Sequence, residues 1–306
     1  MSSQDDNQKS NTTKLRALLE NFRRAIEAKA PQELNELTPK FFQLGKDKEM
    51  SKDLFYKKLA EQHEFAGRWE EAEKTSQLGL ELAISNNNTH YIFKGYYDLS
   101  SLYSLLGKDN EALEAAIRGA DFARQLGRNP TKPMAFRQLA SLYIKHKESA
   151  KALDIIEEIL RLPLKYGANE HQRASALILS AKCRLQIPDI DQALKDLDTS
   201  WSILAPFVAA TALAGIQSSI ANWWEVTSQV SRLLGDTAAS VDSMQKAVDF
   251  RRTVSMAPQL NGPYKYAGLA AALKSYAEIL TASGDLNAAK AAMAEAQEIR
   301  HSIHLP

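Results

Sequence analysis

Apolar residues recur three and four positions apart along most of the chain, with polar residues between them. One such stripe joins Ala72, Leu78 and Leu82, and another contains Ile155 and Ile159. This spacing places the apolar side chains on one face of an α-helix. A strand would instead show sustained alternation of apolar and polar residues, which this sequence lacks. The pattern therefore predicts an all-α protein.

The helical pattern itself repeats about every forty residues. Each copy contains a large residue, a small residue, usually an aromatic residue, a tight turn and a second small residue. The clearest copies are Tyr56, Leu59, Ala60, His63, Gly67 and Ala72; Tyr96, Leu99, Ser100, Tyr103, Gly107 and Ala112; and Phe136, Leu139, Ala140, Tyr143, Lys147 and Ala152. The small residue after the turn falls at 72, 112, 152, 193, 240 and 289, so the spacings are 40, 40, 41, 47 and 49. Self-similarity of this period indicates a repeat architecture.

Each copy divides into two helices at its turn. Glycine supplies the left-handed backbone that ends the first helix, as at Gly107 and Gly284, and a following Asp such as Asp109 can cap the second. Small residues then allow the two backbones to approach closely where the helices cross. We expect helix pairs near 52–86, 89–127, 131–162, 169–204, 207–255 and 263–303.

On these motifs the chain resembles tetratricopeptide-repeat (TPR) proteins over about residues 52–303. The fourth and fifth copies depart from the pattern, because Pro188 replaces the turn glycine, Arg184 the aromatic residue and Ser240 the small residue. The period resembles that of the longer-helix variety found in kinesin light chains and bacterial peptide-sensing regulators. The resemblance implies a right-handed superhelical solenoid of about six antiparallel helix pairs, which we expect to span residues 51–306.

The N-terminal region differs from the repeats. Residues 1–13 form a polar stretch that we expect to be a disordered tail. Residues 14–50 contain an amphipathic segment with Leu15, Leu18 and Phe22 on one face, and we expect capping helices there. The polar start lacks the apolar core of a secretory signal, so we expect a cytoplasmic protein.

One stretch, residues 199–224, contains no charged residue. It is long enough to cross a bilayer, and its tryptophans stand where interfacial aromatic residues would lie. Pro206 and polar residues such as Gln217 and Asn222 oppose that interpretation. We expect the stretch to pack within the solenoid. A dimer interface with a second copy of the chain is the first alternative, and a membrane span is the less favoured one.

Composition and motifs restrict the chemistry. The 38 basic and 37 acidic residues leave no basic stripe for nucleic acid. A single cysteine, Cys183, excludes an intramolecular disulfide framework and a four-thiolate zinc site. His301 and His304 could share a metal ion, but no third ligand is evident. Phosphate-binding glycine loops, zinc-protease motifs and nucleophile elbows are absent. We therefore expect a non-enzymatic protein with no cofactor and no bound metal.

The resemblance implies a concave groove lined by the first helix of each pair, which suits an extended or helical peptide. The candidate groove residues lie one turn from the packing positions: Lys57, Glu61, Lys94, Tyr97, Ser101, Arg137, Ser141, Asn222, Glu225 and Gln229. The charged clamp that binds chaperone tails in this family is matched at Lys57. It fails at Glu61 and Asp98, where acidic residues replace asparagine and would repel a carboxylate.

We therefore predict a protein- or peptide-binding scaffold or adaptor. The alternatives are a sensor of a short signalling peptide, and a sensor or targeting subunit of a separate enzyme. Lys57, Lys94 and Arg137 recur on three successive first helices and predict a cationic side of the groove for an acidic, aromatic segment. The competing interpretation is that these cations pair with Glu61 and Asp98 across the groove.

Overall fold

The computed structural model describes residues 52–126, 132–162, 170–208, 214–256 and 263–305, and a few isolated positions: Ala17, Leu18, Asn21, Arg24, Glu36 and Lys40. The expected tail and nearly all of the expected capping helices lie outside the described residues. Within the described ranges every regular element is a helix and no strand occurs. The prediction of an all-α protein is confirmed.

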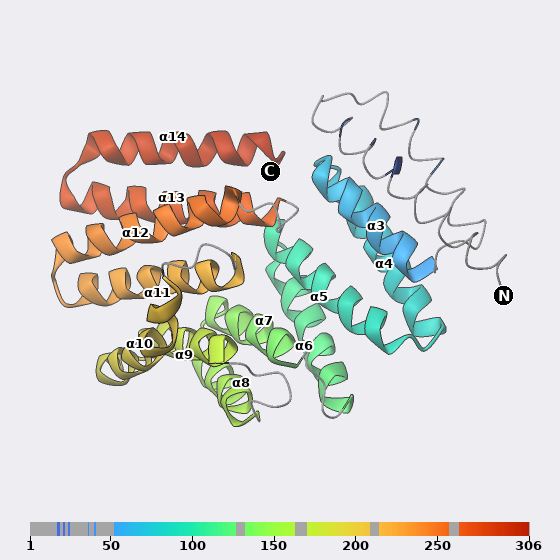
Figure 1. The fold of residues 1–306 in the computed structure, drawn as a ribbon, viewed down its shortest axis with the longest axis horizontal. Coiled ribbons are helices and arrows are strands. Elements are labelled where there is room, and N and C mark those ends of the chain that lie inside the picture. Colours follow the sequence, from blue (N-terminus) through green and yellow to red (C-terminus); the bar gives the residue numbers. More distant parts are fainter. Residues whose placement is uncertain are drawn as a thin grey trace. The chain divides into compact units, whose positions relative to one another are not determined.

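The described helices follow one another as six pairs, each joined by a short turn (Figure 1). The pairs are α3 (Lys52–Phe65) and α4 (Trp69–Ser85), α5 (Thr89–Leu105) and α6 (Asp109–Gln125), α7 (Lys132–Lys145) and α8 (Ser149–Arg161), α9 (Glu170–Arg184) and α10 (Ile190–Leu204), α11 (Ala214–Leu233) and α12 (Thr237–Met256), and α13 (Tyr264–Ser283) and α14 (Leu286–Ser302). A short 3-10 turn, η2 (Ala205–Phe207), follows α10. The fifth pair is described from Ala214 onward.

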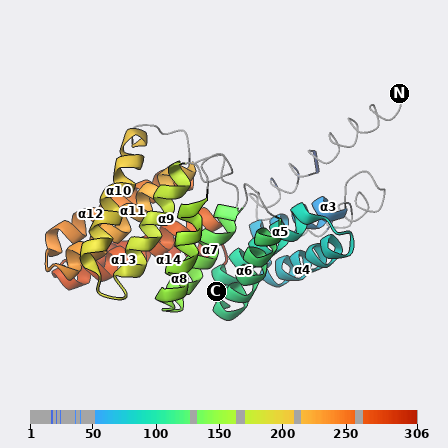
Figure 2. The same ribbon diagram turned by 90° about the horizontal axis from the view of Figure 1, so that it is seen from below.

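The chain forms two compact units, residues 1–102 and 103–306, whose boundary lies within α5. In the N-terminal unit α3 packs against α4, and the two helices lie side by side in both views (Figures 1 and 2). A Cβ atom built on Gly79 would lie 3.0 Å from the Cβ of Tyr56, and one on Gly95 would lie 3.0 Å from the Leu80 side chain. Glycine at both positions therefore allows neighbouring helices to approach closely.

In the C-terminal unit each later pair packs internally, α7 on α8, α9 on α10, α11 on α12 and α13 on α14. Successive pairs are also in contact, through α8 and α9, α10 and α11, and α12 and α13. The core is correspondingly divided into clusters that each combine side chains from neighbouring pairs. In a repeat architecture the folded state is stabilised by the packing of each helix pair against its neighbours, and the contacts within this unit have that arrangement.

Small residues occupy both positions that the repeat pattern assigns to the helix crossings, and each exposes 6% or less of its surface. They are Ala60 and Ala72, Ser100 and Ala112, Ala140 and Ala152, Ala181 and Ala193, Ser228 and Ser240, and Ala277 and Ala289. The fifth pair has two serines, which hydrogen-bond reciprocally. Ser228 Oγ donates to the Ser240 carbonyl at 2.7 Å, and Ser240 Oγ donates to the Ser228 carbonyl at 2.9 Å. The departure noted at Ser240 is thus matched by a second serine on α11.

The turns inside the pairs share one hydrogen-bond pattern. The amide of Arg68 donates to the His63 carbonyl at 2.9 Å, and that of Asp285 donates to the Leu280 carbonyl at 3.0 Å. This six-residue closure follows a residue with positive φ, 92° at Gly284, as in a Schellman motif. The expected Asp cap is present at Asp285, whose side chain accepts from the Ala288 amide at 3.0 Å, but the expected cap at Asp109 is wrong. Lys108 is the N-cap residue of α6, and the Asp109 carboxylate instead pairs with Lys145 at 2.6 Å.

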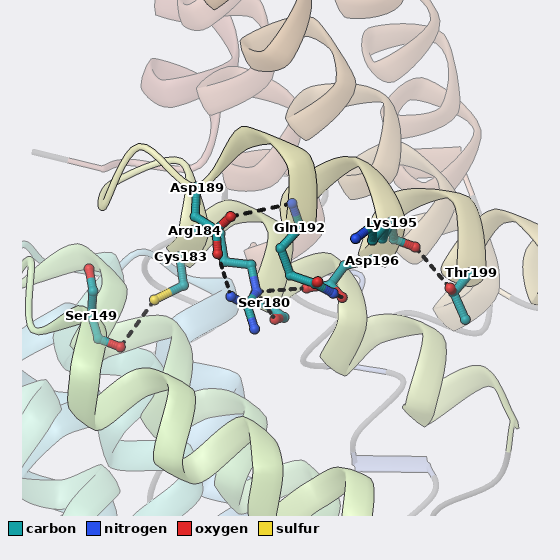
Figure 3. A network of polar contacts seen from close by, with 9 residues as sticks. All are labelled: Ser149, Ser180, Cys183, Arg184, Asp189, Gln192, Lys195, Asp196 and Thr199. Atoms are coloured by element: carbon teal, nitrogen blue, oxygen red, sulfur yellow. Dashed lines mark hydrogen bonds and ion pairs between the residues drawn. The ribbon is translucent and has the colours of Figure 1, made fainter.

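In the fourth pair an ionic network stands where other copies have an aromatic residue (Figure 3). Arg184 Nη1 donates to Asp189 at 2.7 Å, and its Nε donates to Asp196 at 3.1 Å. Asp189 also caps α10, and Asp196 is buried. Arg184 therefore joins the end of α9 to α10. Cys183 is fully buried beside it, and burial raises the pKa of its thiol.

The uncharged stretch is described at 199–208 and 214–224. Trp201 and Trp223 have ring centroids 4.4 Å apart, and Trp224 lies 4.8 Å from Trp223. Trp223 Nε1 donates to the Leu197 carbonyl at 2.9 Å, and all three rings pack against one core cluster. These tryptophans are therefore part of the repeat core. Among the described helices, none combines the length and apolar character needed to span a membrane.

Candidate peptide-binding surface

In the N-terminal unit the candidate residues of α3 form a three-membered ion cluster. The Nζ atoms of Lys57 and Lys58 each lie 2.6 Å from a carboxylate oxygen of Glu61. Burial alone would raise the pKa of Glu61, but hydrogen bonds from Lys57 and Lys58 hold it below its ordinary value. Glu61 is therefore a fixed anion between two lysines, and all three side chains remain partly exposed.

The candidate residues of α5 form a second ordered group. Lys94 Nζ lies 2.7 Å from Asp98 Oδ1 and 5.0 Å from the ring centroid of Tyr97. Ser101 Oγ donates to the Tyr97 carbonyl at 3.0 Å. Burial raises the pKa of Asp98, although the charges of Lys94 and Lys57 oppose the shift. The influence of Lys57 on Asp98 brings the α3 and α5 groups into one electrostatic cluster.

In each of these two pairs, the lysine and the carboxylate belong to the same helix and stand four residues apart. The pair of Lys57 and Glu61 is on α3, and that of Lys94 and Asp98 is on α5. The competing interpretation from the sequence was that these cations pair with Glu61 and Asp98 across the groove. Lys57 and Lys94 instead pair within their own helices. Exposed pairs of this kind contribute little to stability, because solvent screens them and both side chains lose freedom. Their effect is to hold side chains in a defined orientation on the first helices.

In the C-terminal unit, α7 carries two candidates. Arg137 is half-buried, and Ser141 is exposed. Burial and the positive charge of Arg137 lower the pKa of His171 on α9. The two side chains are therefore coupled electrostatically. Arg137 belongs to the other unit than Lys57 and Lys94, and its alignment with them stays a prediction.

The α11 candidates Asn222, Glu225 and Gln229 are half-buried. Arg251, from α12, reaches two of them. Its Nε donates to Glu225 Oε1 at 3.0 Å, and its Nη2 donates to Asn222 Oδ1 and lies 2.9 Å from Glu225 Oε1. The sequence pattern assigned the groove to first helices alone. It therefore missed an arginine that reaches α11 from a second helix.

A further polar contact, also missed, joins α9 to α11. His171 Nε2 lies 3.1 Å from the Gly215 carbonyl and 2.8 Å from Ser219 Oγ, and Ser175 Oγ lies 2.8 Å from the same hydroxyl. Ser219 Oγ also donates to the Gly215 carbonyl at 3.2 Å, so the imidazole, the two hydroxyls and the carbonyl form one compact polar group. The contact positions two first helices against each other.

Within the described ranges, no group of three or more His, Cys, Asp and Glu side chains is placed to hold a metal ion. His301 and His304 are both exposed at the end of the last helix and beyond it.

No known family profile matches the chain, and no curated protein matches it. Solved structures do. The apo form of RapI has a TM-score of 0.56 at 12% identity, over 94% of this chain and 86% of that one. The apo form of the quorum sensor NprR from B. thuringiensis has a TM-score of 0.53 at 13% identity, over 92% of this chain and 86% of that one. Both are TPR-like repeat proteins, so the predicted fold is confirmed.

Proposed function

We propose that this TPR-like repeat protein is a non-enzymatic scaffold or adaptor that binds a protein or peptide segment along the first helices of its repeats. The observation that carries the proposal is the ordering of partly exposed polar side chains on those helices. Lys57, Lys94 and Glu225 each have a fixed partner within the protein. Side chains that are already ordered lose less conformational entropy when a ligand binds.

The chemistry of this surface suits an extended segment with acidic and aromatic residues. The cluster on α3 and α5 contains Lys57, Lys58 and Lys94 against Glu61 and Asp98, so its formal charge is three minus two, or +1. Tyr97 lies under the Lys94 ammonium and adds an aromatic ring to the cluster. Exposed ion pairs are weak, so a ligand carboxylate can exchange with an internal one at small cost.

A signalling-peptide sensor is the second candidate. The observation that favours it is the fold shared with NprR, described as a quorum sensor, over most of both chains. The two candidates use the same surface and differ in whether binding changes a second activity. We assign the protein to the cytoplasm in both cases.

The proposal is tested by affinity capture from an extract of the source organism. The baits are the wild type, Lys57→Glu with Lys94→Glu, and Arg137→Glu. The matched control reverses two exposed lysines on second helices, Lys74→Glu with Lys290→Glu. We expect a partner that wild type and control retain and that at least one first-helix variant loses. Equal retention by all four baits would place the binding surface elsewhere.

A further inference from the structure

Arg251 lies between the first helices of the fifth and sixth pairs, although it belongs to α12. Its guanidinium contacts Glu225 and Asn222 of α11. A Cβ atom built on Gly268 of α13 would lie 3.7 Å from its Nη1. The absence of a side chain at Gly268 therefore leaves open the side of the guanidinium that faces α13.

The guanidinium is held in one orientation by its bonds to α11. Nε and Nη2 form one edge of the group, and Glu225 binds that edge. The Arg251 and Glu225 side chains are only 17% and 24% exposed, so solvent screens the pair less than it screens a surface pair. The opposite nitrogen, Nη1, forms no hydrogen bond with the described residues. Protein atoms do not enclose it either. Nη1 thus reaches solvent as an ordered donor.

Asn222 supplies a second ordered donor. Its Oδ1 accepts from Arg251 Nη2, which fixes the amide plane and turns Nδ2 away from the guanidinium. Nδ2 has no partner within the described ranges. Arg251 Nη1 and Asn222 Nδ2 are therefore two neighbouring donors, and a ligand that binds both must supply a hydrogen-bond acceptor.

The local charge favours an anionic acceptor. Lys265 lies one turn before Gly268 on α13, with its Nζ 5.0 Å from the ring centroid of Tyr266. Arg251, Lys265 and Glu225 together carry two positive charges and one negative, or +1. Glu225 binds the guanidinium through Oε1 at the Nε–Nη2 edge, opposite Nη1. Hydrogen bonds from a guanidinium to a carboxylate are about twice as strong as those between neutral groups.

We infer that Nη1 of Arg251 and Nδ2 of Asn222 bind a carboxylate of the peptide ligand, with Gly268 leaving the access open. This inference rests on the proposed function and names one chemical group of its ligand. The carboxylate can come from an acidic side chain or from the C-terminus of the peptide. Glu225 acts as a positioning residue, because it orients the guanidinium without contacting the ligand.

The test places a carboxylate of the protein itself at the site. Gly268→Glu puts an acidic side chain beside Nη1, and glutamate is a better helix former than glycine, so the helix is preserved. Gly268→Ala adds only a Cβ at ordinary contact distance and leaves Nη1 open. Ala291→Glu places the same new charge at an exposed position of α14, away from the site.

The probes are three pools of short labelled peptides, compared by fluorescence polarisation. One has a free C-terminus and no acidic residue, one has an amidated C-terminus and a single Glu, and one has neither carboxylate. We expect the wild type, Gly268→Ala and Ala291→Glu to bind one or both carboxylate pools about tenfold more tightly than the third, roughly 1.4 kcal/mol. Gly268→Glu should reduce that preference to none, and the preferred pool identifies the source of the carboxylate.

Two results would overturn the inference, and they differ in meaning. If the wild type binds all three pools alike, or if Gly268→Glu keeps the carboxylate preference, peptide binding stands and the assigned site is wrong. If no pool binds any variant, the proposed peptide-binding function fails, and the carboxylate site falls with it.

Discussion

Some repeat positions that usually carry an aromatic or a small residue carry a polar residue in this chain. The structure accommodates each of these polar residues differently. Arg184 replaces an aromatic residue and binds two aspartates. Ser240 replaces alanine and pairs with Ser228. His63 stands where other copies have tyrosine, and it is buried with its Nδ1 lacking a hydrogen bond. Each substitution has a physical consequence that can be measured.

His63 should make stability depend on pH. Burial, assisted by the charge of Arg68, lowers its pKa from 6.5 to about 4, against the opposing effect of Glu71. The unfolded chain therefore binds more protons between these pH values, so stability falls as the pH drops from 6.5 to 4. The shift corresponds to a loss on the order of 3 kcal/mol. We expect His63→Phe to remove most of this slope in urea titrations, and an unchanged slope would contradict the assignment.

The Ser228–Ser240 pair should show strong coupling. Ser228→Ala or Ser240→Ala alone should cost about 0.5–1.5 kcal/mol, since each removes a hydrogen bond from a buried contact. The double variant recreates the alanine pair of other repeats and should cost less than the sum. Thermal or urea unfolding of the four proteins measures this cycle. Additive losses would show that the two hydroxyls act independently.

At the scale of elements, the helices and turns were predictable from the sequence because each leaves a periodic local signal. The spacing of apolar residues located the helices, and Gly67, Gly107, Gly235 and Gly284 marked four of the turns. Asp109 was misassigned because an Asp at the first helical position resembles one at the N-cap.

Part of the candidate surface could also be predicted from sequence, but its internal contacts could not. The four-residue spacing of Lys57 and Glu61 made an intrahelical pair accessible to sequence reasoning. Arg251 gave no such signal, because its partners lie 26 and 29 residues away on another helix. His171 was overlooked for the same reason, since its contacts lie on α11. Contacts between helices depend on crossing geometry, which one-dimensional periodicity does not encode.

The turn glycines give a prediction for one element. Gly284 has φ 92°, and nothing within 4 Å would meet an added Cβ, so the cost of Gly284→Ala is conformational. We expect a loss of about 1–2 kcal/mol in the free energy of unfolding. Lys147 adopts a similar positive φ of 60° without glycine, so Lys147→Gly should not destabilise the protein by a comparable amount. Equal effects of the two changes would contradict this account of the turns.

At the scale of the molecule, stability comes from repeated local packing within each unit, and the aromatic rings of the uncharged stretch belong to that packing. Because Trp201, Trp223 and Trp224 pack against the core, we expect them to be unavailable as a dimer interface. Sedimentation equilibrium of the chain should give a mass near 34.0 kDa. The dimer would be supported instead if the measured mass were twice that value and if Phe207→Glu, in the exposed part of the stretch, restored the monomer mass.

The central claim is that a partner binds along the first helices, and lysine acetylation with mass spectrometry tests it most directly. The captured partner should protect first-helix lysines, such as Lys57, Lys94 and Lys182, from the reagent. Exposed second-helix lysines, such as Lys74, Lys195 and Lys290, should react as they do in the free protein. Protection of the second-helix set, with unchanged reaction at Lys57, Lys94 and Lys182, would contradict the account.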